Sequence, residues 1–179
     1  MNATRVLAAQ HQAIDALFDD IDHEARRNVR ARLAARIAEE LIAHMAAEEG
    51  VFYPTARRAL RDDGGTDAAA HLVDEHVTLR VQLRRVLAAS VDEPAFEEHV
   101  ASLRALFERH AREEERTLFP AVERALGDAE LELLGAEVLA SRPPVWIVTT
   151  DRHALQRQGA GLQLQLGSRV SLPIPPARD

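Results

Sequence analysis

The segments His44-Met-Ala-Ala-Glu48 and His110-Ala-Arg-Glu-Glu114 repeat one pattern, in which a histidine is followed four residues later by a glutamate. Residues four apart on an α-helix lie on the same face, so each segment directs an imidazole and a carboxylate toward one point. Both groups are common ligands of divalent metal ions. The two segments therefore predict two helices that together hold a pair of metal ions.

The repeat extends beyond these two segments. When His44 is aligned with His110, Phe52-Tyr53-Pro54 falls on Leu118-Phe119-Pro120. Each proline lies six residues after the glutamate of its motif, where its ring and its missing N–H should kink or end the helix. The duplication therefore includes a predicted interruption of each helix.

Each half of the repeat also contains an isolated histidine upstream of its motif. His11 precedes His44 by 33 residues, and His76 precedes His110 by 34 residues. Each half thus supplies three polar residues on otherwise apolar helix faces. The six candidate metal ligands are His11, His44, Glu48, His76, His110 and Glu114.

Four segments carry apolar residues at steps of three and four, which is the spacing of an amphipathic helix. The stripes run from Leu7 to Ile21, from Leu33 to Val51, from Leu72 to Val86 and from Phe96 to Leu118. The candidate ligands occupy core positions of these stripes. Ala, Leu, Glu and Arg dominate the composition while aromatic residues contribute only 4%, which favours an all-α fold.

The boundaries between the helices carry turn signals. The segment Arg61-Asp-Asp-Gly-Gly-Thr66 is predicted to be a loop, and Pro94 is placed for the first turn of the fourth helix. Asp128 could cap a shorter fifth helix that ends near residues 142–144. This helix would present Leu131, Leu134 and Val138 on its apolar face.

The sequence pattern changes after Pro144. Val145-Trp-Ile-Val-Thr149 is rich in β-forming residues, and Leu162-Gln-Leu-Gln-Leu166 alternates. We expect one main domain at residues 1–142 and a C-terminal extension at residues 143–179. The extension could be a small hairpin packed on the bundle or a partly disordered segment.

The charge and the apolar runs restrict the possible partners. The 179 residues include 22 basic residues, all arginine, and 29 acidic residues, which gives a formal net charge of -7. An acidic protein repels phosphate backbones, so we expect no nucleic-acid partner. No apolar run is long enough to span a bilayer and the N-terminus does not resemble a secretory signal, so we expect a cytoplasmic protein without a membrane partner. The absence of cysteine excludes disulfides, iron–sulfur clusters and thiol chemistry.

The ordinary alternative to a metal site is a set of hydrogen-bonded core residues. For one histidine on an apolar stripe, that alternative is the usual explanation. Six residues that repeat with matched spacing on four stripes favour metal, because neutral core pairing does not require the same side chains twice. Four imidazoles and two carboxylates also leave coordination positions open on two ions, which suits small-ligand chemistry.

Four neighbouring residues are secondary candidates. His71 precedes His76 by five residues, which places it about 140° away around a helix, so it is at most an additional ligand. Glu49 and Glu115 directly follow the ligand glutamates and are expected to be solvated charges, with alternative ligation as the other interpretation. Tyr53 is expected in the core, where its hydroxyl could also donate a hydrogen bond or an electron to the site.

The doubled motif resembles the hemerythrin-like, or HHE cation-binding, domain family over about residues 1–142. The resemblance implies an up-down four-helix bundle around a non-haem di-iron centre with an oxo or hydroxo bridge. It implies that His11 and His44 ligate one iron and that His76 and His110 ligate the other. Glu48 and Glu114 would bridge the two ions.

Two positions depart from the oxygen-carrying hemerythrins. Those proteins have a second histidine one turn along the third helix, where this chain has Arg80. Their last acidic ligand is an aspartate five residues after the histidine, whereas Glu114 lies at four and Glu115 at five. The pattern is more similar to family members associated with peroxide breakdown, iron or oxygen sensing, or nitric oxide handling.

These observations lead to two hypotheses for the function. The first is an enzyme that disproportionates hydrogen peroxide, as a catalase does. The second is a sensor or binding module for oxygen, nitric oxide or iron, in which the extension after Pro144 contacts a protein partner. Histidine and glutamate also suit zinc and manganese, so the sequence leaves the metal open.

Overall fold

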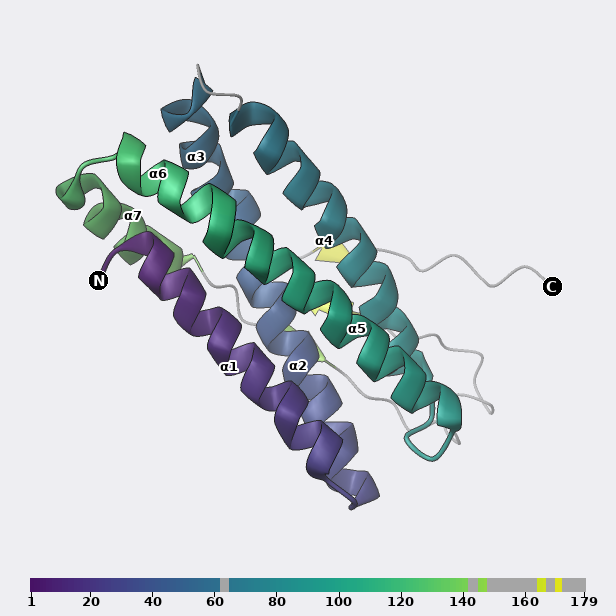
Figure 1. Ribbon diagram of the computed structural model, residues 1–179. Coiled ribbons are helices and arrows are strands. Elements are labelled where there is room, and N and C mark those ends of the chain that lie inside the picture. Colours follow the sequence, from purple (N-terminus) through teal and green to yellow (C-terminus); the bar gives the residue numbers. More distant parts are fainter. Residues whose placement is uncertain (62–64, 142–144, 148–163, 167–169, 172–179) are drawn as a thin grey trace.

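The computed structural model describes residues 1–61, 65–141, 145–147, 164–166 and 170–171. Four long helices form the body of the molecule, and each packs against two of the others in a closed ring (Figure 1). In chain order they are α1 (Ala3–His23), α2 (Arg27–Ala47), α4 (Gly65–Ala88) and α5 (Pro94–Glu113). Consecutive helices run in opposite directions, which confirms the predicted all-α, up-down four-helix bundle.

The helix ends follow local sequence signals, with two differences from prediction. Asn2 caps α1 by accepting the Arg5 N–H at 3.0 Å, and Pro94 begins α5 as predicted. The loop predicted at residues 61–66 is shorter than expected, because α4 already begins at Gly65; residues 62–64 lie outside the described residues. The cap of α7 (Asp128–Ala140) is Gly127 and not Asp128.

Both motif copies contain a π-helical turn. The turns η1 (Glu48–Phe52) and η3 (Glu114–Leu118) follow α2 and α5 directly. The helices do not end at the prolines, because the chain continues as α3 (Tyr53–Ala59) and α6 (Phe119–Ala125). The predicted interruptions are therefore present at both positions, but they are wider turns that begin at the motif glutamates. Such turns are frequent at functional sites.

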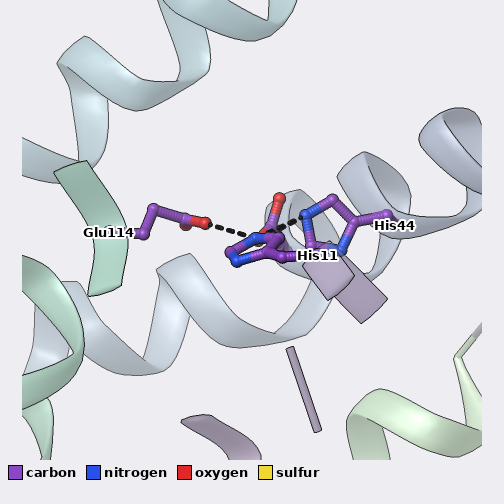
Figure 2. Close-up of side chains that lie close together, drawn as sticks. His11, His44 and Glu114 are labelled. Atoms are coloured by element: carbon purple, nitrogen blue, oxygen red, sulfur yellow. Dashed lines mark hydrogen bonds and ion pairs between the residues drawn. The ribbon is translucent and has the colours of Figure 1, made fainter. Parts of the chain in front are cut away.

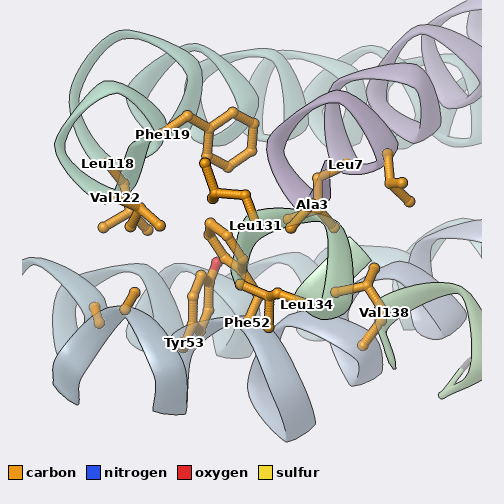
Figure 3. Packing of buried hydrophobic residues seen from close by; sticks show 14 of the residues in the cluster. Ala3, Leu7, Phe52, Tyr53, Leu118, Phe119, Val122, Leu131, Leu134 and Val138 are labelled. Atoms are coloured by element: carbon orange, nitrogen blue, oxygen red, sulfur yellow. The ribbon is translucent and has the colours of Figure 1, made fainter. Parts of the chain in front are cut away.

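Two apolar clusters fill the bundle, one on each side of the candidate ligands. The first cluster includes Leu7, Ala47, Phe52, Leu72 and Leu118, and the second includes Ile14, Leu41, Leu79, Phe107 and Ala111. In the first cluster the rings of Phe52 and Phe119 meet edge to face at 5.5 Å, and α7 adds Leu131 from the side (Figure 3). The clusters hold the four helices in register above and below the polar layer.

Three short strands follow the helices. β1 (Val145–Ile147) pairs antiparallel with β2 (Leu164–Leu166), which pairs antiparallel with β3 (Val170–Ser171). The rest of the predicted extension at residues 143–179 lies outside the described residues. Among the described helices, none is both long enough and apolar enough to cross a membrane.

Candidate metal centre

The six candidate ligands meet in the middle of the bundle, between the two apolar clusters. The long helices supply the histidines and the π-helical turns supply the glutamates. Each of these residues has at most 3% of its surface exposed. In chain order they are His11 on α1, His44 on α2, Glu48 on η1, His76 on α4, His110 on α5 and Glu114 on η3.

The four histidines form two pairs. Nε2 of His11 lies 3.1 Å from Nε2 of His44, and Nε2 of His76 lies 3.1 Å from Nε2 of His110. Two nitrogens that bind one ion at about 2.1 Å and at a right angle are about 3.0 Å apart. Each pair therefore has the spacing of two ligands of a single metal ion.

Glu48 lies between the two histidine pairs. Its Oε1 is 3.1 Å from Nε2 of His44, and its Oε2 is 3.2 Å from Nε2 of His76. One oxygen thus faces each pair. A carboxylate in this position can contribute one oxygen to each of two ions.

Glu114 approaches the same space from η3. Its Oε2 is 3.2 Å from Nε2 of His11 and 3.6 Å from Nε2 of His110, so it also lies between the pairs. Figure 2 shows His11, His44 and Glu114 converging from separate elements. The other oxygen of Glu114 accepts a hydrogen bond from the Tyr53 hydroxyl at 2.8 Å. That hydroxyl also lies 3.3 Å from Nε2 of His76.

The buried carboxylate oxygens need a cation. Both oxygens of Glu48 and Oε2 of Glu114 are fully buried, and none accepts a hydrogen bond from any residue that the structure describes. An ionised oxygen buried without a partner costs several kcal/mol. Two groups bring their ligand atoms within 4.8 Å of one another: His11, His44, Glu48 and Glu114, and Glu48, His76 and His110. The residues therefore fit a pair of metal ions that share Glu48.

The outer nitrogen of each histidine has a polar partner. Metal-binding histidines usually donate this second N–H to a carboxylate or carbonyl, which fixes the ring and leaves the other nitrogen free for the metal. The bonds from Nδ1 are 2.8 Å for His11 to Glu115, 2.9 Å for His44 to Gln10, 2.7 Å for His76 to Glu49, and 3.1 Å for His110 to Glu75. With Nδ1 donating, each facing pair of Nε2 atoms presents lone pairs to the space between them.

Gln10 and Glu75 were not predicted from the sequence. Each directly precedes the isolated histidine of its half, at Gln10-His11 and Glu75-His76. The two positions correspond in the duplication, but they carry different residue types, so they do not stand out as a repeated motif. The two halves differ here, because His44 bonds to a neutral amide and His110 to a carboxylate.

The buried environment of the site also shifts the pKa values of its histidines and glutamates. Burial opposes protonation of His110, but interactions with Glu48 and Glu75 outweigh burial and raise its pKa to about 10. Burial lowers the pKa of His44 to about 4. Burial and the charge of Glu48 raise the pKa of Glu114. Without metal, protons take up part of the role of cations in this layer, so metal binding and protonation compete.

Comparison with known proteins agrees with this geometry. The family model for the hemerythrin HHE cation binding domain matches residues 2–122, which include all six candidate ligands. The chain belongs to the hemerythrin HHE family. Its assignment as a cation-binding, hemerythrin-like protein follows from this match, and the sequence-based resemblance is confirmed.

Several relatives of this HHE protein are similar over most of its length. It is 33% identical over 143 residues to the protein Rv2633c of Mycobacterium tuberculosis, covering 78% of this chain and 84% of the relative. A crystal structure of an HHE cation binding domain-containing protein from Mycobacterium kansasii, a homologue of Rv2633c, superposes with a TM-score of 0.68 at 33% identity. That superposition covers 78% of this chain and 84% of the other.

A Nostoc protein named DNA nickase is 28% identical over 162 residues. The match covers 90% of this chain but only 44% of that relative. The chain therefore spans less than half the length of the Nostoc protein.

The structure places the secondary candidates around the HHE site. Glu49 and Glu115 are not simply solvated charges, because each accepts a hydrogen bond from a candidate ligand. Tyr53 is buried in the core and also donates a hydrogen bond, so both expectations for it are met. His71 is exposed and lies near Glu75 and Glu113, outside the central layer.

Proposed function

We propose that this HHE protein holds two non-haem iron ions with an oxo or hydroxo bridge and disproportionates hydrogen peroxide. His11 and His44 would bind one ion, His76 and His110 the other, and Glu48 and Glu114 would bridge them. The observation that carries the proposal is Glu48, whose two buried oxygens face the two histidine pairs without a hydrogen-bond donor. Four neutral ligands and two anionic ligands leave a cationic centre with open positions for a small anionic or neutral ligand.

Iron held by these residues would supply the two-electron redox chemistry that the reaction requires. In this reaction two molecules of hydrogen peroxide give two of water and one of dioxygen. The protein holds the candidate ligands in fixed orientations. The outer partners fix each imidazole with Nε2 directed inward, and Tyr53 holds one oxygen of Glu114 by donating its proton.

Apolar packing covers the candidate metal layer on both sides along the bundle. The rings of Phe107 and Phe119 lie 5.8 and 5.9 Å from the ring of His11. Tyr53 is fully buried, and burial together with the charges of Glu48 and Glu114 raises its pKa. Tyr53 therefore remains a neutral hydrogen-bond donor, which protects Glu114 from accepting a proton at that oxygen.

Oxygen evolution from hydrogen peroxide tests the enzymatic function. Iron-loaded wild-type protein should evolve oxygen in steady turnover, and Glu48→Ala should abolish it because the shared carboxylate is lost. Glu132→Ala is a matched control, since Glu132 lies on the exposed face of α7. Full iron occupancy without oxygen evolution by the wild-type protein would refute the catalase-like activity.

A sensor is the second candidate, and the strands after the bundle favour it. The antiparallel sheet β1–β2–β3 follows the metal-binding helices but contributes no candidate ligand. If metal occupancy is transmitted to this segment, tryptic cleavage after the arginines of residues 143–179 should change when iron is removed. Identical cleavage patterns with and without iron would count against a sensor.

The name of the Nostoc relative suggests one further test. A net charge of -7 disfavours DNA binding, so we expect this chain not to nick supercoiled plasmid with or without iron. Conversion of the plasmid to the relaxed circle by the wild-type protein, but not by Glu48→Ala, would contradict that expectation.

A further inference from the structure

A cavity of about 340 Å³ lies between α1 and α5, on the outer side of His11. Its lining combines one candidate ligand with residues of both helices. These are His11, Gln12 and Asp15 from α1, Phe107, Glu108, Ala111 and Arg112 from α5, and Glu115 from η3. The cavity therefore reaches from the surface to a ligand of the metal centre.

We propose that this cavity is the route by which a divalent cation reaches the metal centre, a proposal that rests on the centre proposed above. His11 connects the two spaces. Its Nδ1 bonds at 2.8 Å to Glu115, which lines the cavity, and its Nε2 lies 3.2 Å from Glu114 inside the centre. A cation held by Glu115 is one imidazole ring away from its final ligands. The Glu115 side chain is 45% exposed, so it can turn outward to meet an ion.

The charge around the cavity favours a cation over a neutral ligand. Arg104 binds Asp15, Asp19, Asp22 and Glu108, at distances of 2.7 to 3.1 Å. The cavity lining itself holds three carboxylates, Asp15, Glu108 and Glu115, against the one guanidinium group of Arg112. An excess of one charge at an opening raises the local concentration of ions of the opposite charge and steers them inward.

The cavity is formed by α1 of the first repeat with α5 and η3 of the second, and the duplication allows comparison with the equivalent place between α4 and α2. Ala111 aligns with Met45, whose longer side chain is fully buried. Asp15 aligns with Arg80, which donates a hydrogen bond at 2.7 Å to Glu49, the counterpart of Glu115. At the equivalent positions of α2 and α4, a large side chain and an ion pair therefore replace the small and acidic residues that line the cavity.

Two substitutions introduce these counterparts at the cavity. Ala111→Met narrows the cavity, and Asp15→Arg offers Glu115 the ion pair that Glu49 makes with Arg80. The matched controls are Ala105→Met and Asp20→Arg, at exposed positions on the same two helices. Each control introduces the same side chain or charge change away from the cavity.

The measurement is the rate at which metal-free protein takes up Co²⁺, followed by stopped-flow absorbance. Ala111→Met should slow uptake, and Asp15→Arg should slow it about tenfold at low salt, the lower range of electrostatic steering. At about 1 M salt, where the screening length is about 3 Å, Asp15→Arg should approach the wild-type rate while Ala111→Met stays slow. Both variants should reach the wild-type Co²⁺ stoichiometry and show a wild-type circular dichroism spectrum.

Three results would overturn the proposal or its basis. If both variants load Co²⁺ at the wild-type rate, the cavity is not the route, whatever they do to peroxide turnover. If the controls slow uptake as much as the variants, the effect does not belong to this cavity. If the wild-type protein binds no Co²⁺, the metal centre itself is wrong.

Discussion

At the scale of single residues, the duplication includes the outer hydrogen-bond partners of the histidines as well as the candidate ligands. Every candidate histidine uses Nε2 inward and Nδ1 outward, and every outer partner has its counterpart in the other half. The one chemical difference is Gln10 in place of Glu75. A carboxylate partner makes an imidazole a stronger metal ligand than an amide does, because it stabilises positive charge on the ring.

Exchanging these two partners should change metal affinity in opposite directions. Glu75→Gln should weaken metal binding by about 10-fold to 100-fold, the usual effect of losing an outer carboxylate. Gln10→Glu should make metal binding tighter, because a carboxylate then accepts the Nδ1 hydrogen bond of His44. Competition with a chelator of known affinity measures both, and equal affinities for Glu75→Gln and the wild type would contradict the role given to Glu75.

The six candidate ligands were predictable from the sequence, but two of their outer partners, Gln10 and Glu75, were not. The six are found because polar residues recur at matched places on apolar stripes, and the structure brings all six together in one buried layer. Gln10 and Glu75 lie beside the stripe, where polar residues are ordinary on any helix surface. Their role depends on the rotation of each helix about its axis, which the hydrophobic period fixes only approximately.

At the scale of elements, the spacing of apolar residues at steps of three and four predicts the four long helices. It does not predict where each helix ends or which turns are π-helical. The π-helical turns η1 and η3 arise from a change of hydrogen-bond partner, with the N–H of Tyr53 donating to Glu48 and that of Phe119 to Glu114. The pattern of apolar residues carries no signal for this change of hydrogen-bond partner. The prolines indicate where it occurs, because proline lacks the N–H that a regular helix would use there.

The contact between α7 and the start of α1 gives a prediction about two glycines. A Cβ on Gly135 would lie 2.9 Å from the carbonyl carbon of Asn2 and closer still to the carbonyl oxygen of Met1. Gly135→Ala should therefore lower the free energy of unfolding, although alanine favours helices by about 1 kcal/mol. Urea unfolding followed by circular dichroism measures this change.

Gly50 is the matched control for that substitution. It is exposed in η1, and an added Cβ there meets nothing within 4 Å. Gly50→Ala should leave stability unchanged or raise it by up to about 1 kcal/mol. A stabilising Gly135→Ala would show that α7 does not pack closely on the N-terminus.

At the scale of the whole molecule, the bundle encloses a charged layer between two apolar clusters, and this layer links stability to pH and metal. The pKa of His110 is raised from 6.5 to about 10, and the pKa values of His11 and His76 are also raised. A histidine with a raised pKa in the folded state stabilises the fold fully below its unfolded pKa, and that contribution is lost as pH rises through the folded value.

Metal-free protein should therefore become less stable between about pH 6.5 and pH 10, in the range between the unfolded and folded pKa of His110. Metal-loaded protein should not show this loss, because the bound cations replace the protons. Urea unfolding at a series of pH values measures both forms. Metal-free protein whose stability is constant or rises over this range would contradict the proposed proton balance.

The iron content of iron-loaded protein, measured together with its near-ultraviolet and visible spectrum, tests the central claim most directly. The account predicts two iron ions per chain with the charge-transfer absorption of an oxo-bridged ferric pair, and loss of both in Glu48→Ala. One iron ion or fewer per wild-type chain, or two ions without that absorption, would contradict a bridged di-iron centre.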